Sequence, residues 1–239
     1  MTRDYRSIAE EHAARADSPL AAVGVPDPQR FTRLGSIQLA LLKAEGLVRS
    51  SRLLEFGCNV GRLARHAVPY LGEGRYLGLD FSPTMIRHAR DGADAPLSQV
   101  DPKRYHFSQD DGENLGRWLQ SFDFACAFSV FTHMEHEDTL RLLRQFASVL
   151  VPGGRVVCSI LALESELGKL TMLAEADIQY AERWNRMRNV ATTVSMMEHI
   201  AWLAGFDNFR WYMGDVFRVQ LDDGTYDGFR QSVLAAEKV

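Results

Sequence analysis

The sequence has few cysteines, no long apolar run and no block of like charge. Its three cysteines, Cys58, Cys126 and Cys158, lie far apart in or beside expected strands, which favours buried thiols in a reducing cytoplasm over disulfides or a metal site. No apolar run reaches the length of a membrane span, and Met1–Tyr5 lacks the apolar core of a signal peptide. These absences predict a cytoplasmic protein with no membrane partner.

The charge is nearly balanced, with 27 basic and 31 acidic residues and a net charge of −4. Non-specific binding to nucleic acid needs a basic face, so this balance argues against a nucleic-acid partner and leaves only a local basic patch open. Apolar residues make up 46% of the chain, which is enough for a sizeable core. The length of 239 residues fits one α/β domain and leaves two open.

What the sequence does contain is a strand, a glycine turn and a helix start over residues 52–62. Residues 52–56 (RLLEF) are typical of a short buried strand, and the turn GCNVG follows directly. Glycine lets the backbone approach a ligand closely, and a helix start offers unpaired N–H groups. A dinucleotide fingerprint that began at Gly57 would need glycines at Asn59 and Arg62, so a nicotinamide site is excluded.

The pattern Glu55-x-Gly57-x-Asn59-x-Gly61, with Asp80 closing the next expected strand, resembles the first two motifs of class I S-adenosylmethionine-dependent methyltransferases. The family pattern there is acidic-x-Gly-x-Gly-x-Gly. Asn59 stands in place of the middle glycine, a mild departure because Asn tolerates a left-handed backbone. The segments FSVFTHM (128–134) and LVPGG (150–154) resemble the family's stretches after the fourth strand and before the fifth.

The order of expected elements predicts the fold class. Strands are expected at 52–56, 75–80, 104–107, 122–130, 155–161, 209–213 and 231–237, and helices at 2–16, 28–45, 63–71, from 83, at 138–150 and at 195–205. Alternating strands and helices indicate an α/β, doubly wound parallel sheet with right-handed crossovers. The resemblance implies a mostly parallel, seven-stranded Rossmann-like sheet whose last strand is antiparallel.

The expected organisation is a single methyltransferase domain over residues 1–239. It comprises an N-terminal helical cap (1–50), a cofactor-binding core (51–161), a helical insert or lid after strand five (162–194), and a C-terminal helix and hairpin (195–239). The last helix is expected to begin at a capping box, Ser195-x-x-Glu198. One or two helices are expected within 164–190.

Ligands of such sheets bind outside the carboxyl ends of the strands, where several candidate residues fall. The resemblance implies S-adenosyl-L-methionine as cofactor and S-adenosyl-L-homocysteine as product. It assigns the cofactor contacts to Glu55 and the loop of Gly57, Asn59 and Gly61, to Asp80 for the ribose, Phe81 for the adenine face, Asp110 or Asp111 for the adenine amino group, and Ser129 for the methionine end. The competing interpretations are a purely structural loop, a surface acid or a competitor for the cap of the next helix at 80, a core phenylalanine at 81, and a solvated loop at 110–111.

His133 follows the fourth strand and is the candidate catalytic residue. An imidazole titrates near neutral pH and could accept a hydroxyl proton, although a helix cap or gap filler is an equal alternative. The predicted function is methyl transfer to a hydroxyl or amine of a small molecule, with sugars and secondary metabolites as candidate acceptors. The alternatives are a tRNA or protein methyltransferase and a non-catalytic S-adenosylmethionine-binding protein. No metal-ligand cluster is evident, and the oligomeric state is open.

Overall fold

The structure is a computed structural model that describes residues 5–93 and 97–239. Its contacts divide the chain into two units. The first holds described residues up to Asp111 together with Val219–Asp227, and the second holds Gly112–Arg218 together with Gly228–Val239. Residues 2–4 of the expected N-terminal helix lie outside the described residues.

The first unit contains three parallel strands in the order β3-β2-β1. Its elements are α1 (Tyr5–Arg15), α2 (Pro19–Ala22), α3 (Pro28–Ala44), β1 (Arg52–Phe56), α4 (Ala64–Tyr70), β2 (Arg75–Asp80), α5 (Pro83–Ala93), a 3₁₀ turn η1 (Pro102–Arg104), β3 (Tyr105–Gln109), β8 (Val219–Gln220) and β9 (Tyr226–Asp227). The bounds of β1 and β2 are those expected from sequence, because both are apolar runs between polar or glycine-containing turns.

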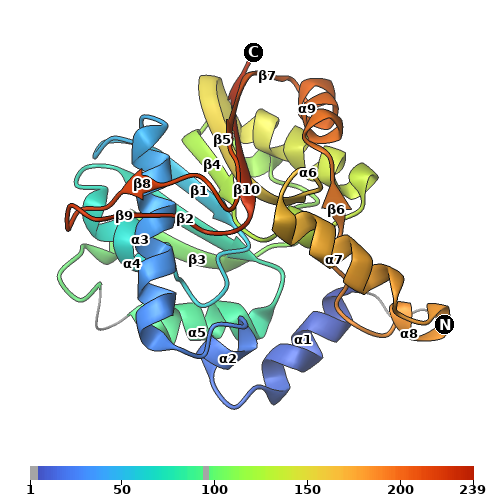
Figure 1. The fold of residues 1–239 in the computed structure, drawn as a ribbon. Helices are drawn as coiled ribbons and strands as arrows, with labels where there is room; N and C mark the ends of the chain where they lie inside the picture. Colours follow the sequence, from blue (N-terminus) through green and yellow to red (C-terminus); the bar gives the residue numbers. More distant parts are fainter. Residues whose placement is uncertain (1–4, 94–96) are drawn as a thin grey trace. The chain divides into compact units, whose positions relative to one another are not determined.

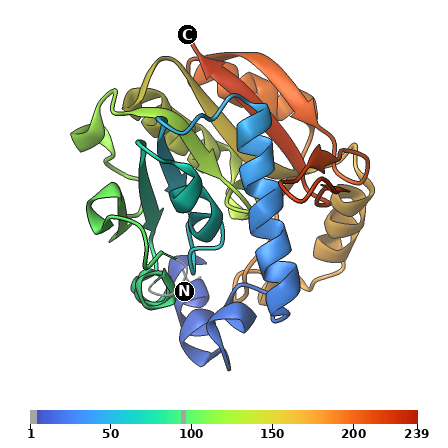
Figure 2. The same cartoon turned by 90° about the vertical axis from the view of Figure 1, so that its left-hand side faces the viewer.

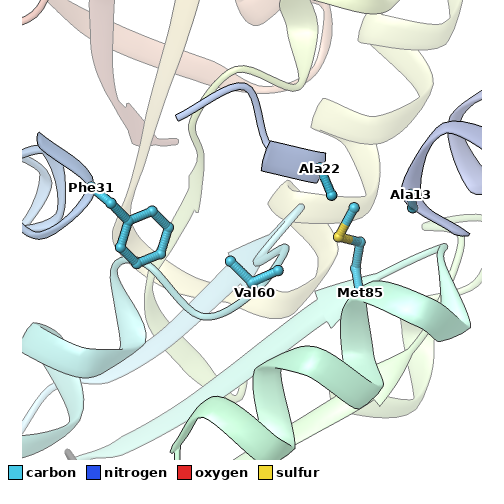
Figure 3. Packing of buried hydrophobic residues seen from close by; sticks show 5 residues of the cluster. All are labelled: Ala13, Ala22, Phe31, Val60 and Met85. Atoms are coloured by element: carbon cyan, nitrogen blue, oxygen red, sulfur yellow. The ribbon is translucent and has the colours of Figure 1, made fainter. Parts of the chain in front are cut away.

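The N-terminal helices pack against the glycine loop and α5 through a small apolar cluster. The cluster joins Ala13 of α1, Ala22 of α2, Phe31 of α3, Val60 of the glycine loop and Met85 of α5 (Figure 3). The short helix α2 was not expected from sequence. It begins at Pro19 because the hydroxyl of Ser18 accepts a hydrogen bond from the backbone N–H of Ala21 at 3.1 Å.

Helix α3 runs beside α4, as two views of the unit show (Figures 1 and 2). Gly35 permits this close approach, because a Cβ there would lie 2.5 Å from the His66 ring and 2.6 Å from the carbonyl oxygen of Arg62. The helix begins where the Asp27 carboxylate accepts from the N–H of Gln29, and Pro28 occupies the first turn.

The β8–β9 hairpin is fastened to α3 by ion pairs. Arg33 contacts Asp227 at 2.8 Å and Asp223 at 3.0 Å, and Lys43 pairs with Asp222. A cavity of about 270 Å³ lies between α3 and this turn. The two cations that line it are paired with the hairpin's own carboxylates, so these charges hold the hairpin in place. The sequence predicted the turn at 222–224 but not its two-residue strands.

The second unit contains strands in the order β4-β5-β10-β7, with β6 also paired to β5. Its elements are η2 (Gly116–Trp118), β4 (Phe122–Ala127), η3 (Phe131–His133), α6 (His136–Val149), β5 (Leu150–Ala162), α7 (Glu166–Ala176), α8 (Tyr180–Arg183), β6 (Ala191–Thr192), α9 (Val194–Leu203), β7 (Phe206–Tyr212) and β10 (Ser232–Lys238). β4 and β5 are parallel, whereas β10 is antiparallel to both β5 and β7 (Figure 1). The expected antiparallel last strand and the two insert helices are present.

Several expected boundaries in the second unit were wrong, among them the start of β7, which is Phe206 rather than residue 209. The fourth strand ends at Ala127 rather than at residue 130, because Ser129 adopts a left-handed backbone with φ of 61°. The fifth strand begins at Leu150, so the Pro-Gly-Gly segment lies inside it and Gly153 takes a φ of 73° there. The cap of α9 is Thr193, whose hydroxyl accepts from the N–H of Met196, and not Ser195.

The three cysteines are buried and form no disulfide, as expected from their spacing. Complete burial raises the pKa of the Cys158 thiol well above its usual range, which keeps this thiol protonated and unreactive. Within residues 5–93 and 97–239, no helix combines the length and the apolar character that crossing a bilayer requires.

Candidate cofactor site and candidate base

The loop after β1 turns at every second residue through a left-handed conformation. The φ angles are 73° at Gly57, 53° at Asn59 and 78° at Gly61. Glycine adopts this region without cost, and Asn is one of the few other residues that does so routinely. Asn59 therefore replaces the family's middle glycine without a change of backbone path.

The N–H groups of this loop bind partners within the first unit. Gly57 and Cys58 donate to the carbonyl of Leu79 at 2.7 and 2.9 Å, and Gly61 donates to the carbonyl of Cys58 at 2.9 Å. The N–H of Asn59 donates to the carboxylate of Asp80 at 3.0 Å. The loop is thereby fixed against the end of β2, and these four donors bind protein acceptors.

Asp80 closes β2 and is 5% exposed. One carboxylate oxygen accepts from the N–H of Ser82 at 2.9 Å and the other accepts from Asn59. Burial raises the pKa of Asp80 to about 6, while these two backbone hydrogen bonds oppose the rise. A carboxylate offers about four lone-pair positions, so Asp80 can also accept the two hydroxyl hydrogens of a ribose.

Glu55 lies on β1 and is 3% exposed. The phenol of Tyr76 donates a hydrogen bond to its carboxyl group. Burial raises the pKa of Glu55 to about 8, and the Tyr76 bond and the nearby Arg62 charge oppose this shift. Arg62 is held in turn by the side-chain oxygen of Gln38 at 3.2 Å. Glu55 is thus a buried acid with an oriented carboxyl group beside the loop.

The raised pKa of Glu55 predicts a pH-dependent stability. The folded state holds this proton up to about pH 8, whereas the unfolded chain releases it near 4.5. The stabilisation is therefore complete below pH 4.5 and is lost as the pH rises through 8, by about 1.4 kcal/mol for each unit of pKa difference. Glu55→Gln removes the titration but keeps an acceptor for Tyr76. Thermal unfolding should show the variant gaining stability relative to wild type between pH 5 and pH 9.

The control for this measurement is Glu73→Gln, at an exposed position before β2. Its difference from wild type should stay constant across the same pH range. A Glu55→Gln difference that is also constant would show that Glu55 ionises in the folded protein as it does in the unfolded chain.

The ends of β2 and β3 are linked to each other. The backbone N–H of Asp110 donates to the carbonyl of Asp80 at 2.9 Å, and the amide of Gln109 donates to the carbonyl of Phe81 at 3.1 Å. These bonds place Asp110 directly beside the end of β2. Asp111 instead forms an ion pair with Arg6 of α1 at 3.0 Å, at an exposed position.

Helix α1 supplies neighbours of this site that sequence reasoning did not identify. The ring of Tyr5 meets the ring of Phe81 edge to face at 6.3 Å between centroids. The carboxylate of Glu10 accepts from the hydroxyls of Ser82 and Thr84 at the start of α5. Burial and the Asp80 charge raise the pKa of Tyr5 to about 12, so its hydroxyl stays protonated beside the acid.

The first unit therefore brings most of the predicted cofactor residues to one end of its three strands. The set comprises Glu55, Gly57, Asn59, Gly61, Asp80, Phe81 and Asp110. These side chains fit an adenosyl group, since an acid and an aromatic ring follow β2 and a second acid follows β3. Among the described residues, no group of His, Cys, Asp and Glu is arranged to hold a metal ion.

Ser129 belongs to the second unit and follows β4. Its N–H donates to the hydroxyl of Ser159 at 2.7 Å, and its own hydroxyl donates to the side-chain oxygen of Gln231 at 2.9 Å. Ser159 donates to the same oxygen at 2.6 Å. This network offsets the cost of a left-handed serine and fixes the chain just after β4.

His133 ends the 3₁₀ turn η3, four residues beyond Ser129, and is half-buried. Its Nδ1 lies 2.7 Å from the carbonyl oxygen of Arg188. Burial lowers the pKa of His133, while the Arg188 bond and the charge of Glu175 oppose the shift. The ring is therefore neutral near pH 7 and carries one nitrogen lone pair. Of the roles considered from sequence, the helix cap is wrong, because the N-cap position of α6 is Glu135; the base and the gap filler both stay open.

The chain is similar to known methyltransferases, both in the sequence of its central segment and in its fold. Residues 54–156 match the family described as "Methyltransferase domain". A crystal structure of a possible histamine N-methyltransferase from Thermotoga maritima is 20% identical, with 88% of this chain and 90% of that chain covered and a TM-score of 0.60.

Two further structures extend the likeness to nearly the whole chain. The magnesium protoporphyrin IX methyltransferase of Synechocystis with bound S-adenosylhomocysteine (SAH) is 18% identical, covers 99% of this chain and 100% of that chain, and has a TM-score of 0.63. A structure of PigF with SAH is 15% identical over all of this chain and 63% of that chain, with a TM-score of 0.67. The matched segment includes the glycine loop, Asp80 and His133. Residues 54–156 thus resemble a methyltransferase domain, and the chain has the fold of S-adenosylmethionine-dependent methyltransferases.

Proposed function

We propose that this enzyme transfers a methyl group to a hydroxyl or amine of a small molecule and that its 239 residues form one methyltransferase domain. The observation that carries the proposal is His133, a half-buried neutral histidine within the matched family segment. A methyl acceptor of either type loses a proton when it is methylated. A neutral imidazole beside the acceptor can take that proton.

The proposed cofactor contacts are those predicted from the family pattern. Asp80 binds the ribose hydroxyls, Phe81 packs on the adenine, and Asp110 accepts from the adenine amino group. The loop of Gly57, Asn59 and Gly61, with Glu55 behind it, orients the methionine part. The family resemblance assigns Ser129 to the methionine part as well. The buried, doubly hydrogen-bonded carboxylate of Asp80 supports this assignment most directly.

The chemistry asks little of the protein beyond position and proton removal. When bound, S-adenosylmethionine supplies a methyl group that its sulfonium already activates. The chain must hold the acceptor in line, exclude water and remove one proton. Positioning alone can lower a barrier by about 7–11 kcal/mol, and a base such as His133 can add roughly a hundredfold to ten-thousandfold in rate.

A small-molecule acceptor agrees with the names of similar proteins and with the charge of the chain. The similar structures include a possible histamine N-methyltransferase, a magnesium protoporphyrin IX methyltransferase and a protein of echinomycin biosynthesis, the last 19% identical. The net charge of −4 offers no general attraction to tRNA.

The proposal is tested with methyl-labelled S-adenosylmethionine and four acceptor classes. These are phenols and sugars, amines, bulk tRNA, and basic proteins. We expect labelled product and SAH with a hydroxyl or amine compound, at a rate that changes little between 50 and 200 mM salt. Turnover with tRNA alone, falling steeply with salt, would replace the small-molecule assignment by a tRNA methyltransferase.

A further inference from the structure

The ring of His133 is oriented by the backbone of a segment far away in the sequence. A carbonyl oxygen only accepts hydrogen bonds, so the bond from His133 to Arg188 requires the hydrogen on Nδ1. In the neutral ring, the lone pair is then on Nε2. The segment that carries Arg188 thus determines which nitrogen of His133 can accept a proton.

This segment has no regular secondary structure over residues 187–190, so side chains must hold it. Glu175, at the end of α7, accepts from the guanidinium of Arg186 at 3.2 Å and from the N–H and side-chain amide of Asn189 at 3.0 and 3.1 Å. These two residues flank Arg188 on either side. The N–H of Val190 also donates to the carbonyl of Thr132 at 2.7 Å.

The side chain of Arg188 adds a second attachment to the region of His133. Its guanidinium pairs with Glu135 at 3.0 Å and lies over the Trp184 ring at 4.4 Å from the centroid. The charged groups of this network are therefore Glu135, Glu175, Arg186 and Arg188.

Glu175 is 7% exposed, which is unusual for a carboxylate. A buried charge is costly unless paired and hydrogen-bonded, and the three donors from 186–189 meet that requirement. Its negative charge also favours the protonated form of His133, because the two groups attract when the ring is charged.

We propose that Glu175 is a positioning residue for His133: it holds the 186–189 segment so that the Arg188 carbonyl fixes the ring with its proton-accepting nitrogen at Nε2. This rests on the proposed role of His133 as base. It gives a backbone carbonyl the orienting role that an aspartate has in the Ser-His-Asp triad.

Two variants separate the segment from the charge. Glu175→Ala removes all three hydrogen bonds, so the Arg188 carbonyl loses its fixed position and both tautomers of His133 should be populated. Glu175→Gln retains an acceptor for Asn189 but removes the charge, so the tautomer should persist. Without that charge, the pKa of His133 should fall, because the Glu175 carboxylate favours the protonated ring.

The readout is nitrogen NMR of the histidine rings in the full chain, with the His133 signals assigned from their loss in His133→Asn. We expect the wild type to show hydrogen on Nδ1, the Ala variant a mixture, and the Gln variant the wild-type tautomer with a lower pKa. Turnover should fall about ten- to hundredfold in Glu175→Ala. In Glu175→Gln, the acid limb of the pH–rate profile should move to lower pH.

Glu198→Ala is the matched control. Glu198 accepts from the indole of Trp211 at 2.8 Å in the same unit, and it has no bond to residues 186–190. This variant should lose stability with no change in the tautomer or pKa of His133. If both Glu175 variants also lose stability with no change in the tautomer or pKa of His133, Glu175 is only structural and the positioning role is wrong. Full turnover in His133→Ala would instead refute the proposal that His133 is the base. The tautomer measured by NMR does not depend on that result, so the two failures can be told apart.

Discussion

Asp80→Ala is expected to weaken S-adenosylmethionine binding by about 1.5–3 kcal/mol, roughly ten- to more than a hundredfold in Kd. The variant removes a carboxylate that is buried, partly ionised at neutral pH and already oriented by Asn59 and Ser82. Hydrogen bonds from a ribose to such a charged acceptor are stronger than neutral ones. Isothermal calorimetry with S-adenosylmethionine and with SAH measures the change directly.

Asp91→Ala, an exposed acid on α5, is the control for this measurement and should bind the cofactor as wild type does. Circular dichroism must show that Asp80→Ala is folded, because the variant also leaves the N–H groups of Asn59 and Ser82 without their acceptor. A folded variant with unchanged affinity would remove Asp80 from the cofactor site.

The local part of the site could be predicted from sequence because it is encoded in consecutive residues. β1, the turn at 57–61 and the first turn of the following helix form one continuous stretch, and the left-handed φ angles fall on two glycines and an asparagine. The carboxylate of Asp80 is 21 residues beyond Asn59, one crossover away. Such short-range relations follow from the strand–helix–strand pattern itself.

The residues that surround this site could not be predicted because they come from distant segments. Glu10 meets Ser82 across 72 positions, and His133 meets Arg188 across 55. No periodicity relates positions so far apart. The polar character of α1 gave no sign that Tyr5 and Glu10 would lie against the start of α5.

The wrong boundaries arose where two local rules competed. Pro152-Gly153-Gly154 is typical of a turn, yet β5 runs on through it as a bulge. Pairing with β4 passes from Leu150 directly to Arg155, and Gly153 takes a positive φ between these two pairs. Thr193 and Ser195 are both acceptable helix caps. The two-residue strand β6 ends at Thr192, so the helix starts directly after it and Thr193 becomes the cap.

His133→Asn is expected to lower kcat by roughly a hundredfold to ten-thousandfold while cofactor affinity stays unchanged. Asparagine can still donate from its amide to the Arg188 carbonyl, so the 186–190 segment keeps its attachment, but it cannot accept a proton. His133→Ala should lose as much activity and some stability as well. Comparison of the two variants separates loss of the base from loss of the hydrogen bond.

The pH dependence of kcat/KM gives this prediction its second measurement. Burial lowers the pKa of His133 from the usual imidazole value of 6.5. Wild-type activity should therefore rise with pH and reach its plateau at a lower pH than an ordinary imidazole would give. The acid limb should vanish in His133→Asn. His136→Ala is the control, because the His136 ring bonds to the Thr192 hydroxyl at 3.1 Å, and this variant should keep both the limb and the rate. Undiminished turnover in His133→Asn with the limb intact would assign the proton transfer to another group.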